Sequence, residues 1–141
     1  MVRSFSILIF IILTACTSGV HLESVNYNDL FHDGNSKVWL VNKVMVNNAV
    51  ISSVKNSDKH VLIFHENNAC EYIAMKDITR KSPERGYFIL NSELRTVYIE
   101  FEDDHRWEFT IAYIEEDSIL LEPTSTSDAN FTIQLTPFPE L

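Results

Sequence analysis

The sequence predicts an all-β fold, in which an antiparallel up-and-down meander of about eight strands closes into a barrel. Short apolar segments separated by turn residues recur between residues 37 and 136. No long helical pattern interrupts them, so parallel strands joined by crossover helices are not expected. Two neighbouring segments also alternate between apolar and polar residues, which is typical of strands with one dry face. A two-sheet β-sandwich is the alternative that this pattern allows.

The first expected strand is long and carries Trp39, either unbroken or as two halves bent near Asn42-Lys43. A turn at Asn47-Asn48 follows it. In order, the segments expected to form strands are 37–46, 49–54, 60–65, 70–75, 86–90, 97–101, 107–113, 118–121 and 131–135.

The clearest strand signal lies on either side of Asp103-Asp104, which fits a tight hairpin. The apolar side chains that alternate with polar ones are Val97, Ile99 and Phe101 before this turn, and Trp107, Phe109, Ile111 and Tyr113 after it. Pro137 and Pro139 end the last strand, because proline cannot donate a hydrogen bond to a neighbouring strand.

Residues 1–15 have the features of an export signal. Arg3 precedes an unbroken apolar run over residues 7–13, which is shorter than the roughly 20 residues that a membrane-spanning helix needs. The sequence Leu13-Thr14-Ala15-Cys16 resembles the lipobox of bacterial lipoproteins. An ordinary secretory signal with a cysteine by chance at its cleavage site is the alternative.

The lipobox resemblance implies that the signal is cut before Cys16 and that acyl chains on this cysteine anchor the protein to a membrane. Two or more chains make such an anchor durable. Thr17 stands where an aspartate would favour the inner membrane, so this resemblance implies the outer membrane. No acidic run follows Cys16, which favours the periplasmic face over the cell surface.

Removing 15 of the 141 residues leaves 126, a normal size for one domain. Residues 16–36 are polar and irregular, as expected for a lipidated tether, and residues 37–141 form the expected barrel domain. The apolar exceptions in the tether are Val25, Tyr27, Leu30 and Phe31. They would form a short helical turn that docks on the domain, or a contact for a partner.

Charge and cysteine content narrow the classes of function. The formal net charge of −9 opposes binding to nucleic acid, which depends on Lys and Arg at phosphates. The chain has two cysteines, and lipidation of Cys16 would leave Cys70 without a disulfide partner. We expect Cys70 to be a small buried hydrophobic residue.

The order of the strand segments also suggests a family. Trp39 lies in the first strand, and Leu62-Ile63-Phe64 ends in a polar turn. The segments that follow are Tyr87-Phe88-Ile89-Leu90, Val97-Tyr98-Ile99-Glu100-Phe101, Trp107-Glu108-Phe109 and Ile119-Leu120-Leu121-Glu122. Over residues 37–136 this succession resembles the small lipocalin-like lipoproteins of Gram-negative bacteria. It departs from the better-known lipocalins at Lys37-Val38-Trp39, which replaces their Gly-x-Trp start.

The resemblance implies a barrel whose apolar interior holds a small hydrophobic ligand, since eight strands leave room for one at most. The aromatic side chains expected to line such a cavity are Trp39, Phe64, Tyr87, Phe101, Trp107, Phe109 and Tyr113. Alternatively, these large side chains fill the interior.

Catalytic and metal signatures are not visible. No pair of the five histidines has the spacing of a zinc site. The acidic residues between 100 and 108 lack a calcium-binding loop, and no Gly-x-Ser-x-Gly elbow is present. With three glycines in all, phosphate-binding loops are not expected. We therefore expect a protein that is not an enzyme and has no metal or cofactor.

Two functions agree with these features. The first is a lipid-anchored accessory or assembly subunit of an outer-membrane protein complex, with Tyr27, Phe31 and Phe138 as partner contacts. The alternative is a module that carries a small hydrophobic molecule inside the barrel.

Overall fold

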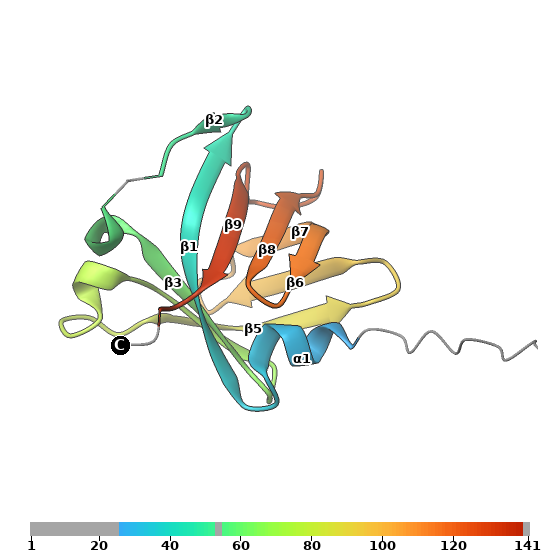
Figure 1. Ribbon diagram of the computed structural model, residues 1–141, viewed down its shortest axis with the longest axis horizontal. Coiled ribbons are helices and arrows are strands. Elements are labelled where there is room, and N and C mark those ends of the chain that lie inside the picture. Colours follow the sequence, from blue (N-terminus) through green and yellow to red (C-terminus); the bar gives the residue numbers. More distant parts are fainter. Residues whose placement is uncertain (1–25, 53–54, 140–141) are drawn as a thin grey trace, which may run out of the picture.

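The computed structural model describes residues 26–52 and 55–139, so Cys16 and the expected signal peptide lie outside the described residues. Within this part of the chain the secondary structure is almost entirely β, with one short α-helix and two 3₁₀ helices (Figure 1). The elements are α1 (Tyr27–His32), β1 (Ser36–Val46), β2 (Ala49–Val50), η1 (Asn56–Asp58), β3 (His60–His65), β4 (Ala69–Ala74), η2 (Met75–Asp77), β5 (Glu84–Asn91), β6 (Thr96–Phe101), β7 (Arg106–Glu115), β8 (Ser118–Pro123) and β9 (Thr132–Pro137).

The sheet is a closed antiparallel barrel. Its strands follow the order β2-β1-β3-β4-β5-β6-β7-β8-β9, and β1 also pairs with β9. The first half of β1 pairs with β3, while its central and later part pairs with β9, so one long strand closes the ring. The prediction of an up-and-down barrel is confirmed, and this closure excludes the β-sandwich. The short β2 pairs with the end of β1 and lies outside the ring of eight strands (Figure 1).

The two ends of the barrel differ. We call the end with α1 and the hairpins β3–β4, β5–β6 and β7–β8 the closed end (Figure 1). We call the opposite end, where the connections β1–β3, β4–β5, β6–β7 and β8–β9 lie, the open end. The connection from β1 to β3 includes β2 and η1, and the one from β4 to β5 includes η2.

The helix α1 is fixed by its ends. The Asn26 side chain accepts a hydrogen bond from the backbone N–H of Asn28 and so caps the first turn. At the other end Asp33 takes a left-handed conformation with φ 52°, and its N–H donates to the Asp29 carbonyl. The helical turn expected in the tether is therefore present.

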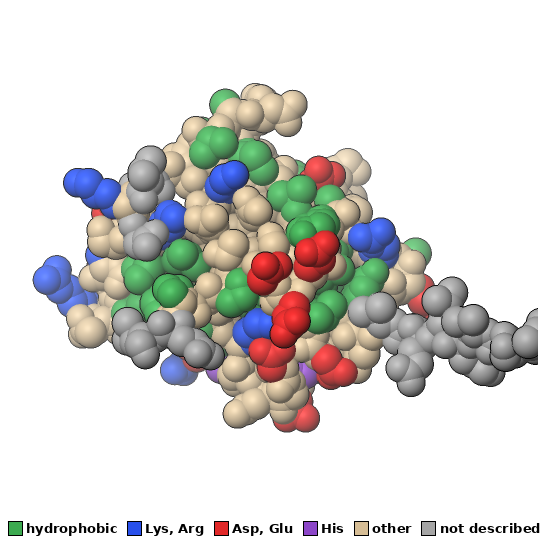
Figure 2. All heavy atoms as spheres, viewed as in Figure 1, with side chains coloured by type: hydrophobic (Ala, Val, Ile, Leu, Met, Phe, Trp, Pro, Cys, Tyr) green, Lys and Arg blue, Asp and Glu red, His purple; other side chains and the backbone are tan. Residues whose placement is uncertain are grey.

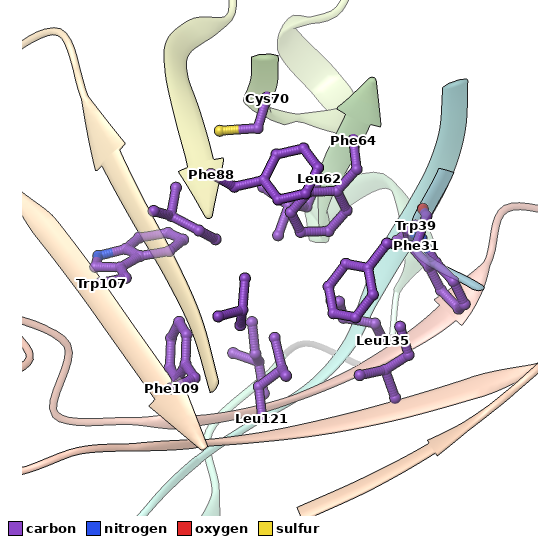
Figure 3. Close-up of a cluster of buried hydrophobic side chains, with 14 of the residues drawn as sticks. Phe31, Trp39, Leu62, Phe64, Cys70, Phe88, Trp107, Phe109, Leu121 and Leu135 are labelled. Carbon is purple, nitrogen blue, oxygen red and sulfur yellow. The ribbon is translucent and has the colours of Figure 1, made fainter. Parts of the chain in front are cut away.

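Phe31 attaches α1 to the barrel. Its side chain is wholly buried, at 0% exposure, and the indole N–H of Trp39 donates to its backbone carbonyl over 2.9 Å. The Phe31 ring lies 4.9 Å from that of Phe64, which in turn lies 4.8 Å from Phe88 (Figure 3). Helix α1, which lies in the segment expected as a tether, thus packs against the barrel through Phe31. The interior near the closed end is filled.

A register shift in β7 overturns one expectation. In the pairing with β8, Ile111 lies opposite the buried Leu121, but Tyr113 lies opposite Leu120. The bulge between Ile111 and Tyr113 turns the later side chain outward, because an extra residue reverses the inside–outside alternation. Tyr113 is 40% exposed on the outer surface and does not line the interior.

Candidate functional site

The candidate site is a cavity of about 300 Å³ in the open end of the barrel. This volume lies at the lower limit of small-molecule sites, which range from about 300 to 1,000 Å³. Its apolar lining consists of Val41, Val44, Ile51, Trp107, Phe131 and Ile133. Its polar lining consists of Ser52, Asp58, Lys59, His60 and Tyr72.

Most of the apolar wall comes from β1 and β9, which pair where the barrel closes, and from Trp107 on β7. Ile51 follows β2, and Phe131 directly precedes β9. Val41 and Val44, both on β1, flank the bulge that this strand forms against β9. Trp107 near the start of β7 lies edge-on to Phe131, with 5.4 Å between ring centroids. These two rings form an aromatic corner of the cavity.

The polar side is built around an aromatic pair. The rings of His60 and Tyr72 stack with centroids 4.8 Å apart and planes 7° apart. This contact arises because His60 begins β3 and Tyr72 lies in β4, with both side chains on the inner face. Trp107 meets the Tyr72 ring edge-on at 5.1 Å, so two neighbouring rings hold this tyrosine in place.

Both members of the pair are neutral near pH 7. Burial, and next the charge of Lys76, lower the pKa of His60, while Glu84 and Asp77 act in the opposite direction. Burial, and next the charge of Glu84, raise the pKa of Tyr72 to about 12. The pair therefore presents polar atoms to the cavity without a net charge.

Lys59 brings a positive charge to the same side. Its Nζ donates to the Asn42 side-chain oxygen over 2.7 Å in a partly buried hydrogen bond. This bond ties the start of β3 to the middle of β1 across the edge of the cavity.

Trp107, one of the aromatic residues predicted to line a cavity, lines the cavity at the open end. Trp39, Phe64 and Phe109 instead belong to the buried core (Figure 3). Phe101 belongs to the same core, with its ring centroid 6.2 Å from that of Tyr72. Tyr87 is 45% exposed on the outer face, because its neighbour Phe88 takes the inward position. Tyr87 and Tyr113 are therefore corrected as lining residues.

The sequence reasoning missed most of the actual lining. Phe131 and Ile133 carry a signal that was visible, since they alternate with polar residues in the last strand. Nothing in the local pattern separates the lining residues from the filled core. That distinction depends on which end of the barrel α1 fills.

The predicted partner contacts have different environments. Phe31 is buried in the core, so its assignment as a contact surface is corrected. Tyr27 is half-buried and packs against the same core. Phe138 is half-buried in a separate groove of about 330 Å³ on the outer face of β1, β3 and β4.

This outer groove is almost wholly apolar. Its lining is Val38, Val61, Ile63, Ile73, Ile78, Pro83 and Phe138, with Glu71 at one side. Val61 in its floor is only 2% exposed, although its side chain lies on the outside of the sheet. Hydrophobic side chains gather over β3 on the face that Figure 2 shows.

Another hollow, of about 490 Å³, lies outside β4, β5 and β6. Its lining includes charged side chains, among them Arg85 and Glu100, and Glu100 accepts hydrogen bonds from the hydroxyls of Tyr87 and Tyr98. We favour the smaller cavity as a binding site, because it lies in the mouth of the barrel and its lining is mainly apolar.

Two kinds of site are absent from the described part of the chain. In residues 26–52 and 55–139, no group of three or more His, Cys, Asp or Glu side chains could hold a metal ion. In the same residues, no helix has the length and apolar character to cross a membrane.

Comparisons with known proteins bear on the fold. No family model matches the sequence, and no curated protein matches it. The chain is similar to the NMR structure of a protein from Bacteroides uniformis ATCC 8492, with a TM-score of 0.56. The two are 13% identical, and the match covers 79% of this chain and 93% of that chain. At this identity the likeness supports a shared barrel fold alone.

Proposed function

We propose that this protein binds a small, mainly apolar molecule in the open end of its barrel. The observation that carries the proposal is the cavity of about 300 Å³, whose apolar wall is accompanied by a few polar groups on one side. Small-molecule sites commonly have this composition, since apolar surface provides affinity and placed polar groups provide orientation. The filled closed end limits the ligand to this part of the interior.

The two tryptophans allow a direct test. Trp107 lines the cavity, whereas the Trp39 indole is bonded to the Phe31 carbonyl at the closed end. We would titrate the ¹⁵N-labelled protein with medium-chain amphiphiles and follow both indole N–H signals by NMR. Saturable shifts of the Trp107 signal, with the Trp39 signal unchanged, are expected. Equal shifts of both signals, or of neither, would contradict binding at the open end.

A cavity-blocking variant sharpens this test. Val44→Phe places a ring in the cavity and is expected to weaken binding at least tenfold. Val38→Phe is the matched control, because Val38 lies on the same strand but is 37% exposed in the outer groove. Binding that survives Val44→Phe unchanged would place the ligand elsewhere.

A second proposed function rests on the outer groove. We propose that the protein also acts as an accessory subunit that docks on an outer-membrane protein through this groove. Its apolar lining, with Phe138 at the C-terminal side, supports the proposal, because contiguous exposed apolar surface commonly marks interaction sites.

The docking proposal can be tested by co-purification from native membranes. Phe138→Asp would place a charge in the groove and is expected to remove any stoichiometric partner. Ile89→Asp is the control, since Ile89 is 57% exposed on the outer face of β5 and lies outside the groove. Loss of the partner in both variants, or in neither, would contradict docking at the groove.

The anchor proposed for either role is an acyl group on Cys16, which the lipobox-like sequence supports. Metabolic labelling with a clickable palmitate analogue should label the protein, and Cys16→Ala should abolish the label. Cys70→Ala is the matched control and should keep it, because Cys70 is 1% exposed. Membrane fractionation with protease protection would then test the proposed location at the periplasmic face of the outer membrane.

A further inference from the structure

The hydroxyl of Tyr72 is a hydrogen-bond donor that the protein leaves available on a residue lining the cavity. Tyr72 is half-buried, and this hydroxyl makes no hydrogen bond to any residue in the described part of the chain. Among the same residues, no wholly buried side-chain nitrogen or oxygen lacks a partner. The hydroxyl therefore has access to solvent, and Tyr72 lines the cavity, so a molecule bound there can accept its hydrogen bond.

The position of this hydroxyl is fixed before a ligand arrives. The Tyr72 ring is stacked on His60 at 4.8 Å and meets Trp107 edge-on at 5.1 Å. Such preorganisation increases affinity, because little side-chain freedom remains to be lost on binding. Val44 and Ile133 line the same cavity and offer apolar surface for the rest of the ligand.

The charges around the pair disfavour an anionic ligand. Asp58 lines the cavity, and Glu84 and Asp77 act on His60 from β5 and η2. Of the positive groups, Lys76 lies on η2, and the Lys59 ammonium lines the cavity while donating to Asn42. These opposite charges roughly balance, so a carboxylate moved from water to this place would lose its hydration without an excess of positive charge to offset the loss, which is costly.

We infer that the ligand is an uncharged amphiphile whose carbonyl or ether oxygen accepts a hydrogen bond from the Tyr72 hydroxyl, with its apolar part against the β1–β9 wall. This inference rests on the proposed binding function and adds the class of ligand. Burial raises the pKa of Tyr72 to about 12, so the hydroxyl remains a donor throughout the neutral range.

A matched pair of ligands tests the class. The affinities of 2-octanone and octanoate for the protein would be measured at pH 7.5 by the Trp107 NMR signal. We expect 2-octanone to bind at least tenfold more tightly. Octanoate binding as tightly as 2-octanone, or more so, would overturn the assignment of an uncharged ligand while leaving the proposed function intact. Failure of both probes to bind would count against the proposed function and the inference together.

A single-atom change tests the donor. Tyr72→Phe removes only the hydroxyl and keeps both ring contacts, so the barrel should fold as before. We expect it to weaken 2-octanone binding by about two- to tenfold, the range for one neutral hydrogen bond. Tyr113→Phe, the same change on the outer face, should leave the affinity unchanged. Equal affinity of Tyr72→Phe and the unsubstituted protein would overturn the role of Tyr72 without affecting the proposed function.

Discussion

The indole Nε1–H of Trp39 donates to the backbone carbonyl of Phe31 over 2.9 Å, and both side chains are wholly buried. This bond joins α1 to the first strand of the barrel and satisfies a carbonyl near the end of a short helix. A helix of six residues has little stability of its own, so its position depends on such tertiary contacts. The closed end is therefore a packed structure in which helix and strand stabilise each other.

Trp39→Phe should reveal the contribution of this bond. The smaller ring keeps much of the packing but leaves the Phe31 carbonyl buried without its donor. A buried acceptor without a partner costs about 1–3 kcal/mol, and we expect the free energy of unfolding to fall by at least that amount. Urea unfolding followed by circular dichroism would measure it. A change below about 0.5 kcal/mol would show that water replaces the indole at this site.

Phe31→Ala and Phe138→Ala should differ sharply in stability. Phe31 is wholly buried against Phe64, so its truncation is expected to lower the free energy of unfolding by about 3–5 kcal/mol. Phe138 is half-buried in the outer groove, so Phe138→Ala should lower the free energy of unfolding much less. Equal losses in the two variants would contradict the assignment of α1 to the core.

The strands were predictable because burial on one face leaves a period-two pattern in the sequence. The expected segment 60–65 coincides with β3, and the long first strand is present as β1. Where consecutive residues are all apolar, the pattern no longer shows which side chains point inward and which point outward. This explains the wrong prediction for Tyr87, which lies next to the inward-pointing Phe88 and itself points outward.

The errors at the site have a different cause. An extra residue in β7 reversed the orientation of Tyr113, and the bulge leaves no local mark because it falls in the apolar run of residues 111–114. The filling of one end by Phe31 depends on a contact between distant parts of the barrel. The His60–Tyr72 pair depends on the register of two strands. None of these follows from composition or periodicity.

Gly86→Ala should destabilise the barrel by steric conflict. A Cβ atom at Gly86 would lie 2.3 Å from the backbone oxygen of Glu100 on β6, where the paired strand cannot give way cheaply. Overpacking of this kind typically costs about 1–3 kcal/mol. Thermal unfolding would measure the loss.

Gly34 provides the control for the glycine prediction. Its φ is +71° and a Cβ atom at this position would have nothing within 4 Å, so Gly34→Ala carries only the conformational cost of a left-handed residue. Gly34→Asn should recover part of that cost, because asparagine tolerates this conformation. At position 86, asparagine should instead be at least as harmful as alanine. Recovery by asparagine at both positions would contradict the steric explanation.

Cys70 should resist alkylation in the folded protein. Its side chain is 1% exposed, and burial, then the charge of Glu71, raise the pKa of its thiol to about 12. The reactive thiolate is therefore scarce at pH 8. In a Cys16→Ala background, iodoacetamide should modify Cys70 slowly in buffer and rapidly in guanidinium chloride, as mass spectrometry would show. Similar rates in both solutions would contradict this burial.

The stacked His60 should make stability depend on pH below neutrality. Burial lowers the pKa of His60 in the folded state below its usual 6.5, with a further contribution from Lys76. As the pH falls below 6.5, the unfolded chain takes up a proton that the folded protein does not, so the free energy of unfolding must fall. The stabilisation is present above pH 6.5 and is lost as the pH falls through the folded-state pKa.

His60→Phe isolates this effect, since a phenyl ring keeps the stacking on Tyr72 but cannot be protonated. Urea unfolding of both proteins between pH 4.5 and 7.5 is expected to give a steeper decline for the unsubstituted protein. The difference between the two profiles removes the contribution of the other titratable groups. Parallel profiles would show that His60 takes up its proton equally well in both states. The stack would then not shield it from water, and the polar side of the cavity would carry a positive charge in mild acid.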